Sequence, residues 1–225
     1  MKRKLEECKF EVSFHTDLDN NQMKHKFDEF THTLRENDSV LFYFSGHGLS
    51  YNGRQFLIPC NMIEPENAYQ IKFKAFGCHA AILQLARYVG SGLKIIITDA
   101  CRTEYEKVLK GIRLKTGDAY SIKFDPNGIR NNVPDVQKNI SDDVELRNVI
   151  RMCASIDGQA AEAPIGSSLS YYTQSMLNNI LTPNQSIMQL NIAISEELKE
   201  RDANPELSII RAGTLVETFR FNENN

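Results

Sequence analysis

The sequence contains no long apolar run, no apolar segment after its basic N-terminus and no marked excess of one charge. Its longest apolar runs, VLFYF and LKIII, are much shorter than a bilayer-spanning helix requires. The basic start MKRKLEECKFEV is not followed by the apolar stretch of a secretory signal. The net charge is −3 and the pI is about 6.0, so no basic nucleic-acid-binding face is expected. These absences predict a cytoplasmic protein whose partners include neither membranes nor nucleic acid.

Cysteine pairs at the spacing of a zinc site or a redox motif are also missing. The five cysteines are scattered along the chain without any C-x-x-C pair. In a reducing compartment we expect free thiols, most of them acting as small buried apolar residues. We expect no metal site and no cofactor. The glycine-rich patterns that bind nucleotide phosphates are absent as well, which disfavours a nucleotide-binding domain.

What the chain does contain is enough apolar material for one domain. It has 225 residues, 41% of them hydrophobic. Strand-like and helix-like patterns alternate, which predicts an α/β fold with a mainly parallel sheet. The expected strands are 10–18, 39–46, 54–62, 93–102, 148–155 and 214–221, and the expected helices are 20–38, 78–92, 169–181 and 186–201.

Some of these elements carry more specific signals. The run 39–46 is continuously apolar, as in a central parallel strand that is covered on both faces. Asp19 or Asn20 can cap the helix 20–38, and Gly90 can end the helix that starts at residue 78.

Two reactive side chains follow the expected buried strands. His47 stands between two glycines just past one strand, and Cys101 stands just past the apolar part of another. The carboxyl ends of parallel strands meet at one edge of the sheet, where ligands bind. We therefore expect the two side chains to lie together although they are far apart in the chain. Gly46 would allow a sharp turn, and Gly48 would let its amide approach a substrate closely.

A thiol beside an imidazole makes a nucleophile and its base. The imidazole of His47 would take the proton of Cys101, and the thiolate would attack a carbonyl carbon. The amides of Gly48 and Cys101 are candidates for the oxyanion hole, and the imidazolium would protonate the leaving amine. This pattern predicts amide hydrolysis through a thioester. The alternative for His47 is a histidine whose hydrogen bonds are satisfied within a turn.

The residues around both groups extend the pattern. SGHG holds His47, DACR holds Cys101, and FLIPCN, IIITDACR and MCASIDGQAAEA follow in order. This resembles the caspase signature Q-A-C-[RQG]-G, which has its histidine about 50 residues upstream. The chain is thus similar to the caspase-like cysteine peptidases (caspases, metacaspases and paracaspases), most of all to the paracaspase branch. The resemblance covers most of residues 9–221, and residues 106–145 match poorly.

The resemblance implies a fold and a domain organisation. The fold would be a caspase-like three-layer sandwich, in which helices flank a mainly parallel central sheet. A single peptidase domain, 1–225, would consist of a large-subunit-like part at 1–115, a linker loop at 116–145 and a small-subunit-like part at 146–225. The linker is polar and rich in loop-forming residues, as expected of a functional or flexible loop.

Acidic residues near the nucleophile predict the substrate class. Asp99 lies two residues before Cys101, where caspases that cut after aspartate have glutamine. A carboxylate at this position suits a cationic side chain, arginine above all. The resemblance adds Glu162 as a second acidic pocket residue. We therefore expect cleavage of protein substrates after arginine and then lysine. Alternatively, Asp99 pairs with Arg102 or caps the next turn, and Glu162 is a solvated loop residue.

One departure from the family pattern concerns the N-terminal region. Family members begin with an apolar strand and a helix, and that strand lies in the sheet between the strands expected here at 10–18 and 39–46. The resemblance implies that this first strand is missing and that MKRKLEEC is the tail of the helix, as in a truncated, fragmentary or degenerate copy. The alternative function is a catalytically impaired scaffold that binds partners in a signalling complex.

The last expected strand, 214–221, would form an edge of the sheet. Exposed edges pair readily with other strands, and the resemblance implies dimerisation at this edge. We therefore expect a homodimer through the C-terminal edge strand.

Overall fold

A four-stranded sheet forms the centre of the computed structural model, which describes residues 1–63, 65, 68–105, 146–164, 166–167, 169–201 and 203–223. The strand order is β1-β5-β6-β7, where β1, β5 and β6 are parallel and β7 is antiparallel to β6. The strands are β1 (Val40–Ser45), β5 (Lys94–Asp99), β6 (Val149–Cys153) and β7 (Glu206–Ile210).

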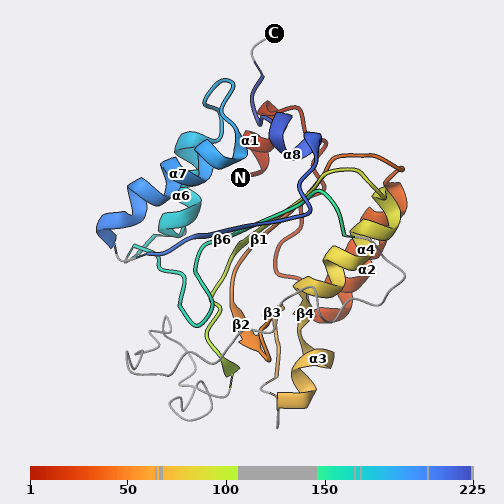
Figure 1. Ribbon diagram of the computed structural model, residues 1–225. Coiled ribbons are helices and arrows are strands. Elements are labelled where there is room, and N and C mark those ends of the chain that lie inside the picture. The colour runs from red at the N-terminus through yellow and green to blue at the C-terminus, as the bar shows by residue number, and fades with distance from the viewer. Residues whose placement is uncertain are drawn as a thin grey trace.

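A second, smaller sheet lies beyond the carboxyl ends of β1 and β5 (Figure 1). It is antiparallel and is made of β2 (Gly48–Tyr51), β3 (Arg54–Leu57) and β4 (Phe76–Gly77). Asn52 and Gly53 form the turn between β2 and β3 with φ values of 50° and 67°, as in the tight turns that suit β-hairpins. The strand expected at 54–62 is shorter than predicted, because β3 ends at Leu57.

Helices cover both faces of the large sheet, so the molecule has three layers (Figure 1). The helices α1, α6, α7 and α8 pack on one face and the helices α2 and α4 on the other. The helices are α1 (Lys2–Glu7), α2 (Asn20–Thr33), α3 (Ile71–Lys74), α4 (Cys78–Val89), α6 (Tyr171–Asn179), α7 (Ile187–Leu198) and α8 (Thr214–Thr218), with short 3₁₀ turns η1 (Ala68–Gln70) and η3 (Lys199–Arg201). The predicted three-layer sandwich is confirmed.

Strand β5 lies at the centre of the core. All six of its residues are buried. Ile95 and Ile97 point into the cluster beneath α6 and α7, whereas Ile96 joins the cluster beneath α2 and α4. This alternation is the side-chain period of a strand, and burial on both faces explains the continuous apolar run.

Local capping signals set where the helices begin and end. Asp19 accepts a hydrogen bond from the backbone of Gln22, and the Gln22 side chain accepts one from the backbone of Asp19. Such a capping box satisfies donors that the first turn leaves open. At the end of α4, Gly90 has a φ of +52°, which glycine adopts without strain. Both predicted helix boundaries are thus confirmed.

The N-terminal part of the sheet differs from the prediction. The segment 10–18 forms no strand, and Phe14 is 59% exposed. Phe10 and Val12 pack on the same side of the sheet as α1, and the chain then continues to α2 on the other side. Strand β1 is an outer strand rather than the predicted central one. Among the described residues no strand pairs with the edge of β1 that faces away from β5. The segment 10–18 therefore has no adjacent strand with which its backbone could form a hydrogen-bonded ladder.

The C-terminal part of the sheet differs as well. The residues expected to form the last strand contain helix α8 instead, and the edge strand is β7. The segment of β7, ELSII, is only five residues long and starts soon after η3 ends at Arg201. It alternates polar and apolar residues over only four positions, which is too short a pattern to identify a strand. The prediction that the edge strand lies at 214–221 was therefore wrong, although an edge strand from the C-terminal region does exist.

Other predictions about organisation concern parts that the structure does not describe. The linker loop at 116–145 lies outside the described residues. Within the described residues, no helix has the length and apolar character needed to cross a membrane.

Candidate functional site

The ends of β1 and β5 bring the two predicted reactive residues to one place. In the parallel pairing of these strands Ser45 lies opposite Asp99, so His47 and Cys101 are each two residues beyond the same rung. The amide of Gly46 donates to the carbonyl oxygen of Asp99 at 3.0 Å, which extends the contact past the strands. His47 is exposed and Cys101 is partly exposed. The loops that carry both residues thus lie side by side at the carboxyl edge of the sheet.

Gly48 is where these two loops touch. A Cβ atom built on Gly48 would lie 2.6 Å from the carbonyl oxygen of Cys101 and 2.9 Å from the Cβ of Ala100. Since contacts this short do not occur for real side chains, only glycine allows the two backbones to approach so closely. Gly48 also begins β2, so the small sheet is held directly against the Cys101 loop.

The sulfur of Cys101 lies against the loop that follows β6. The amide of Ala161 donates to Cys101 Sγ at 3.4 Å, and Sγ lies 4.0 Å from the carbonyl oxygen of the same residue. Burial is the main influence on this thiol and raises its pKa; the Ala161 amide opposes the increase and the charge of Asp99 adds to it. The thiol is therefore protonated in the resting protein at neutral pH, and a base must remove its proton before it can attack.

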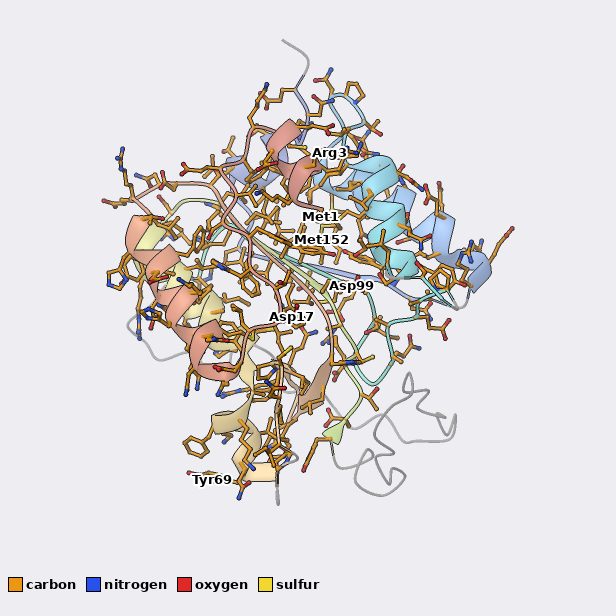
Figure 2. All side chains as sticks on the ribbon, turned by 180° about the vertical axis from the view of Figure 1, so that it is seen from behind. Met1, Arg3, Asp17, Tyr69, Asp99 and Met152 are labelled. Atoms are coloured by element: carbon orange, nitrogen blue, oxygen red, sulfur yellow. The ribbon has the colours of Figure 1, made fainter. Side chains whose placement is uncertain are left out.

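Asp99 lies inside the molecule at the end of β5, only 3% exposed (Figure 2). Three hydroxyl groups donate to the same carboxylate oxygen, Oδ2. They belong to Ser170 at 2.5 Å, Thr173 at 2.6 Å and Ser45 at 3.2 Å. The partners of the Asp99 carboxylate are thus these hydroxyl groups and not Arg102, which was the alternative expected from the sequence.

Glu162, the second predicted acidic residue, follows Ala161 and is exposed. Its carbonyl oxygen accepts a hydrogen bond from the amide of Tyr171, at the first turn of α6. The backbone of Glu162 is therefore anchored beside the residue that contacts the Cys101 sulfur. Its position in the chain brings it to the same end of the sheet as Asp99.

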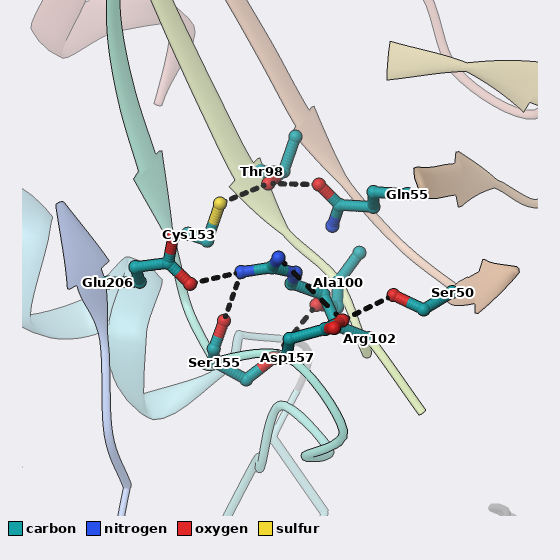
Figure 3. A network of polar contacts seen from close by, with 9 residues as sticks. All are labelled: Ser50, Gln55, Thr98, Ala100, Arg102, Cys153, Ser155, Asp157 and Glu206. Atoms are coloured by element: carbon teal, nitrogen blue, oxygen red, sulfur yellow. Dashed lines mark hydrogen bonds and ion pairs between the residues drawn. The ribbon is translucent and has the colours of Figure 1, made fainter. Parts of the chain in front are cut away.

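Arg102, directly after the candidate nucleophile, is the centre of a buried polar network (Figure 3). Its guanidinium forms an ion pair with Glu206 on β7 and lies 3.7 Å from Asp157. Asp157 in turn accepts a hydrogen bond from Ser50 on β2 at 2.7 Å. Burial would lower the pKa of Arg102, but Cys153, Glu206 and Asp157 outweigh burial and raise it. The network ties the Cys101 loop to both sheets.

The backbone adds to this connection. The amide of Arg102 donates to the carbonyl oxygen of Gln159 at 2.9 Å, and the amide of Gly158 donates to that of Arg102 at 3.0 Å. The loop after β6 therefore runs alongside the Cys101 loop over several residues. This pairing positions Ala161 next to the sulfur.

Sequence reasoning missed the partners of Arg102 and the hydroxyl groups around Asp99. Glu206 and Thr173 lie 104 and 74 residues from the groups that they contact, so no local pattern links them. The one available signal is the arginine itself, because a charged residue after a buried strand needs a partner.

The described residues offer little support for a metal centre: no three His, Cys, Asp or Glu side chains among them gather closely enough to hold an ion. The five cysteines are free thiols.

Comparison with known proteins gives one finding. A family model for the caspase domain matches residues 1–219, which is nearly the whole chain and includes both loops described above. No curated protein matches the chain.

Proposed function

The chain belongs to the caspase domain family, whose members are cysteine peptidases, and we propose that it is an endopeptidase that cleaves protein substrates after arginine and, second, lysine. The observation that carries this proposal is the contact at Gly48, which leaves no room for a side chain between the His47 loop and the Cys101 loop. Within the family we assign the chain to the paracaspase branch, on the order of its motifs along the chain and on Glu162 as a second acidic pocket residue.

In this proposal the two side chains act as nucleophile and base. His47 removes the proton from Cys101 Sγ, and the sulfur attacks the carbonyl carbon of the scissile bond. The amides of Gly48 and Cys101 stabilise the oxyanion. The imidazolium gives its proton to the leaving amine, so that a thioester to Cys101 remains. Water, deprotonated by His47, then hydrolyses the thioester and restores the thiol.

The environment of the thiol supports a role for His47 as a base. Because burial raises the pKa of Cys101, few thiolates exist before substrate binds. The proton transfer must therefore accompany the attack, and the exposed imidazole at the neighbouring strand end is the group placed to accept it.

The preference for basic residues rests on Asp99 and Glu162. Asp99 is buried, and its carboxylate accepts hydrogen bonds from three hydroxyl groups. Glu162 is exposed on the adjoining loop. Two carboxylates at one end of the sheet suit a guanidinium or an ammonium group and repel an aspartate side chain.

Fluorogenic peptides that end in arginine, lysine or aspartate test the proposal directly. We expect cleavage after arginine, weaker cleavage after lysine and none after aspartate, with loss of activity in Cys101→Ala and His47→Ala. A chloromethyl ketone that ends in arginine should add its mass to Cys101. Absence of both cleavage and labelling in the folded protein would favour the alternative, a scaffold without peptidase activity.

We also propose that the protein forms a homodimer through β7. This strand is the outer strand of the large sheet on the β6 side, and its five residues are only half-buried. Light scattering after size-exclusion chromatography should give twice the chain mass. A proline in place of Ser208, at the middle of β7, should favour the monomer, and an unchanged dimer in that variant would contradict the proposal.

A further inference from the structure

A chain of buried hydroxyl groups leads from strand β1 through helix α6 to Asp99. Thr173 Oγ1 lies 2.6 Å from Asp99 Oδ2 and 2.6 Å from the hydroxyl oxygen of Tyr43. Thr173 is 2% exposed, so neither bond competes with bulk water. The Tyr43 hydroxyl also contacts Ser45, which donates to Asp99 from β1.

The chemistry of the groups sets the direction of this chain. An ionised carboxylate only accepts hydrogen bonds, so Thr173 must use its single hydroxyl proton for Asp99. The Tyr43 hydroxyl must then donate to Thr173, which requires a protonated tyrosine. Burial, the largest influence, raises the pKa of Tyr43 to about 12, so the tyrosine keeps its proton at every pH at which the protein would work.

The chain also sets which oxygen of Asp99 a substrate would meet. All three hydroxyl donors reach Oδ2. Two of them, Ser170 and Thr173, are the N-cap and the third residue of α6, so the positive end of this helix faces the same oxygen. With Oδ2 saturated, a substrate cation would pair with Oδ1, and the orientation of the carboxylate decides whether Oδ1 is presented.

We propose that Tyr43 and Thr173 are positioning residues that orient Asp99 and thereby determine how tightly the site holds a basic substrate side chain. This inference rests on the proposed function. Neither residue touches the substrate: Thr173 fixes the carboxylate, and Tyr43 fixes Thr173. The two residues therefore act mainly in series, with a second and weaker route from Tyr43 through Ser45, and they affect binding of the substrate rather than the chemical step.

Steady-state kinetics with an arginine peptide tests this. Thr173→Val keeps the shape and removes the donor, and we expect KM to rise roughly tenfold, the loss of one hydrogen bond to a charged group, with kcat nearly unchanged. Tyr43→Phe should raise KM less. The double variant should lose clearly less than the sum of the two single effects, because Tyr43 acts on Asp99 mainly through the threonine hydroxyl. Thr173→Ser, which keeps the hydroxyl, should restore the wild-type KM.

Two matched control variants remove a threonine hydroxyl and a tyrosine hydroxyl that do not contact Asp99. Thr31 is a fully buried threonine whose hydroxyl donates to the carbonyl oxygen of Asp28 at 2.9 Å, and the Tyr88 hydroxyl contacts His32 at 3.2 Å. Thr31→Val and Tyr88→Phe should leave KM unchanged.

The outcomes separate the two proposals. If the wild-type protein cleaves after arginine but Thr173→Val and Tyr43→Phe keep its KM, only the positioning role is overturned. A loss of kcat at constant KM, or effects of the two variants that simply add, also overturns it. Failure of the wild-type protein to cleave any basic peptide overturns the proposed function and this inference together. Should Thr173→Val fail to fold, Tyr43→Phe and Thr173→Ser still decide the matter.

Discussion

The sulfur of Cys101 is subject to opposing influences within a few ångströms. Burial and the negative charge of Asp99 favour the protonated thiol, whereas the amide of Ala161 favours the thiolate, and the net effect is a raised pKa. A raised pKa slows unwanted oxidation and alkylation, since the thiolate is the reactive form. The reactivity of this residue therefore depends on a base that removes its proton.

This environment predicts how the thiol responds to pH. Because its pKa is raised, the thiolate fraction of Cys101 should climb steadily across neutral pH instead of levelling off. Between pH 7 and pH 9 we expect iodoacetamide alkylation to accelerate on the order of 100-fold, since the thiolate fraction rises about tenfold per pH unit below the pKa. Mass spectrometry of the Cys101 peptide measures it, with Cys101→Ala as the control that assigns the label. A rate that is already constant below pH 7 would instead indicate a preformed thiolate–imidazolium pair.

At the level of elements, the site is a junction of two sheets. The small sheet touches the Cys101 loop through Gly48, and Asp157 joins β2 to the buried Arg102. Edge strand β7 reaches the same arginine through Glu206. A displacement of any of these elements would therefore move the residue next to the candidate nucleophile.

The contact at Gly48 predicts a severe effect of a single methyl group. In Gly48→Ala the new Cβ would have to push away backbone atoms of the Cys101 loop. We expect the free energy of unfolding of this variant to fall by about 1–3 kcal/mol. We also expect kcat/KM to fall roughly 100-fold or more, because the His47 loop and the Cys101 loop would move apart. Gly77→Ala, where the added Cβ comes no closer than 3.6 Å to any neighbour, is the matched control and should behave like the wild type.

The ion pair between Arg102 and Glu206 predicts a second effect at this level. In Glu206→Ala the guanidinium of Arg102 stays nearly fully buried, and the more distant Asp157 is then its one remaining acidic partner among the described residues. We expect a loss of about 2–3 kcal/mol in unfolding free energy, as for a broken buried pair. Urea denaturation measures it. Glu217→Ala, at an exposed position on α8, should change the stability by much less, and equal losses in the two variants would contradict this account.

Considered as a whole, the molecule is organised around β5, whose first residue is a fully buried lysine. Lys94 donates from Nζ to the carbonyl oxygen of Gly90 at 2.7 Å, at the end of α4. The C-terminal end of a helix favours a positive charge, but burial still lowers the pKa of Lys94 from its ordinary 10.5 to about 8. The protonation state of Lys94 therefore contributes a pH-dependent part of the unfolding free energy.

The sign of that dependence follows from proton counting. Between pH 8 and 10.5 the unfolded chain keeps the Lys94 proton while the folded protein releases it, so this group makes folding more favourable as pH rises. Relative to Lys94→Met, the wild-type unfolding free energy should increase by about 2 kcal/mol between pH 7.5 and 9.5. Denaturation at both pH values measures the difference. The exposed Lys72→Met should show no such trend, and a flat difference for Lys94→Met would refute the assignment.

Short-range patterns in the sequence identified the helices α2, α4, α6 and α7 and the strands β1, β3, β5 and β6, and they located the two strand ends that precede His47 and Cys101. They did not identify β7, and the strands expected at 10–18 and 214–221 do not form. Apolar runs and capping residues identify β5 and α2, and the glycines around His47 mark a chain turn after a strand. Because parallel strands end at a common edge, the meeting of the His47 and Cys101 loops followed without knowledge of the fold. The buried face of an element and the cap of a helix depend on residues that are close together in the sequence, so both can be predicted from local patterns.

Only the tertiary structure decided which groups surround these residues. The three hydroxyls on Asp99 and the acidic partners of Arg102 come from distant segments. Likewise, the same run VLFYF is compatible with a central or an outer strand, and β1 is the outer one. A periodic pattern shows which side of an element is buried but not which element covers that side, because the covering element is set by the tertiary arrangement of segments that are distant in the sequence.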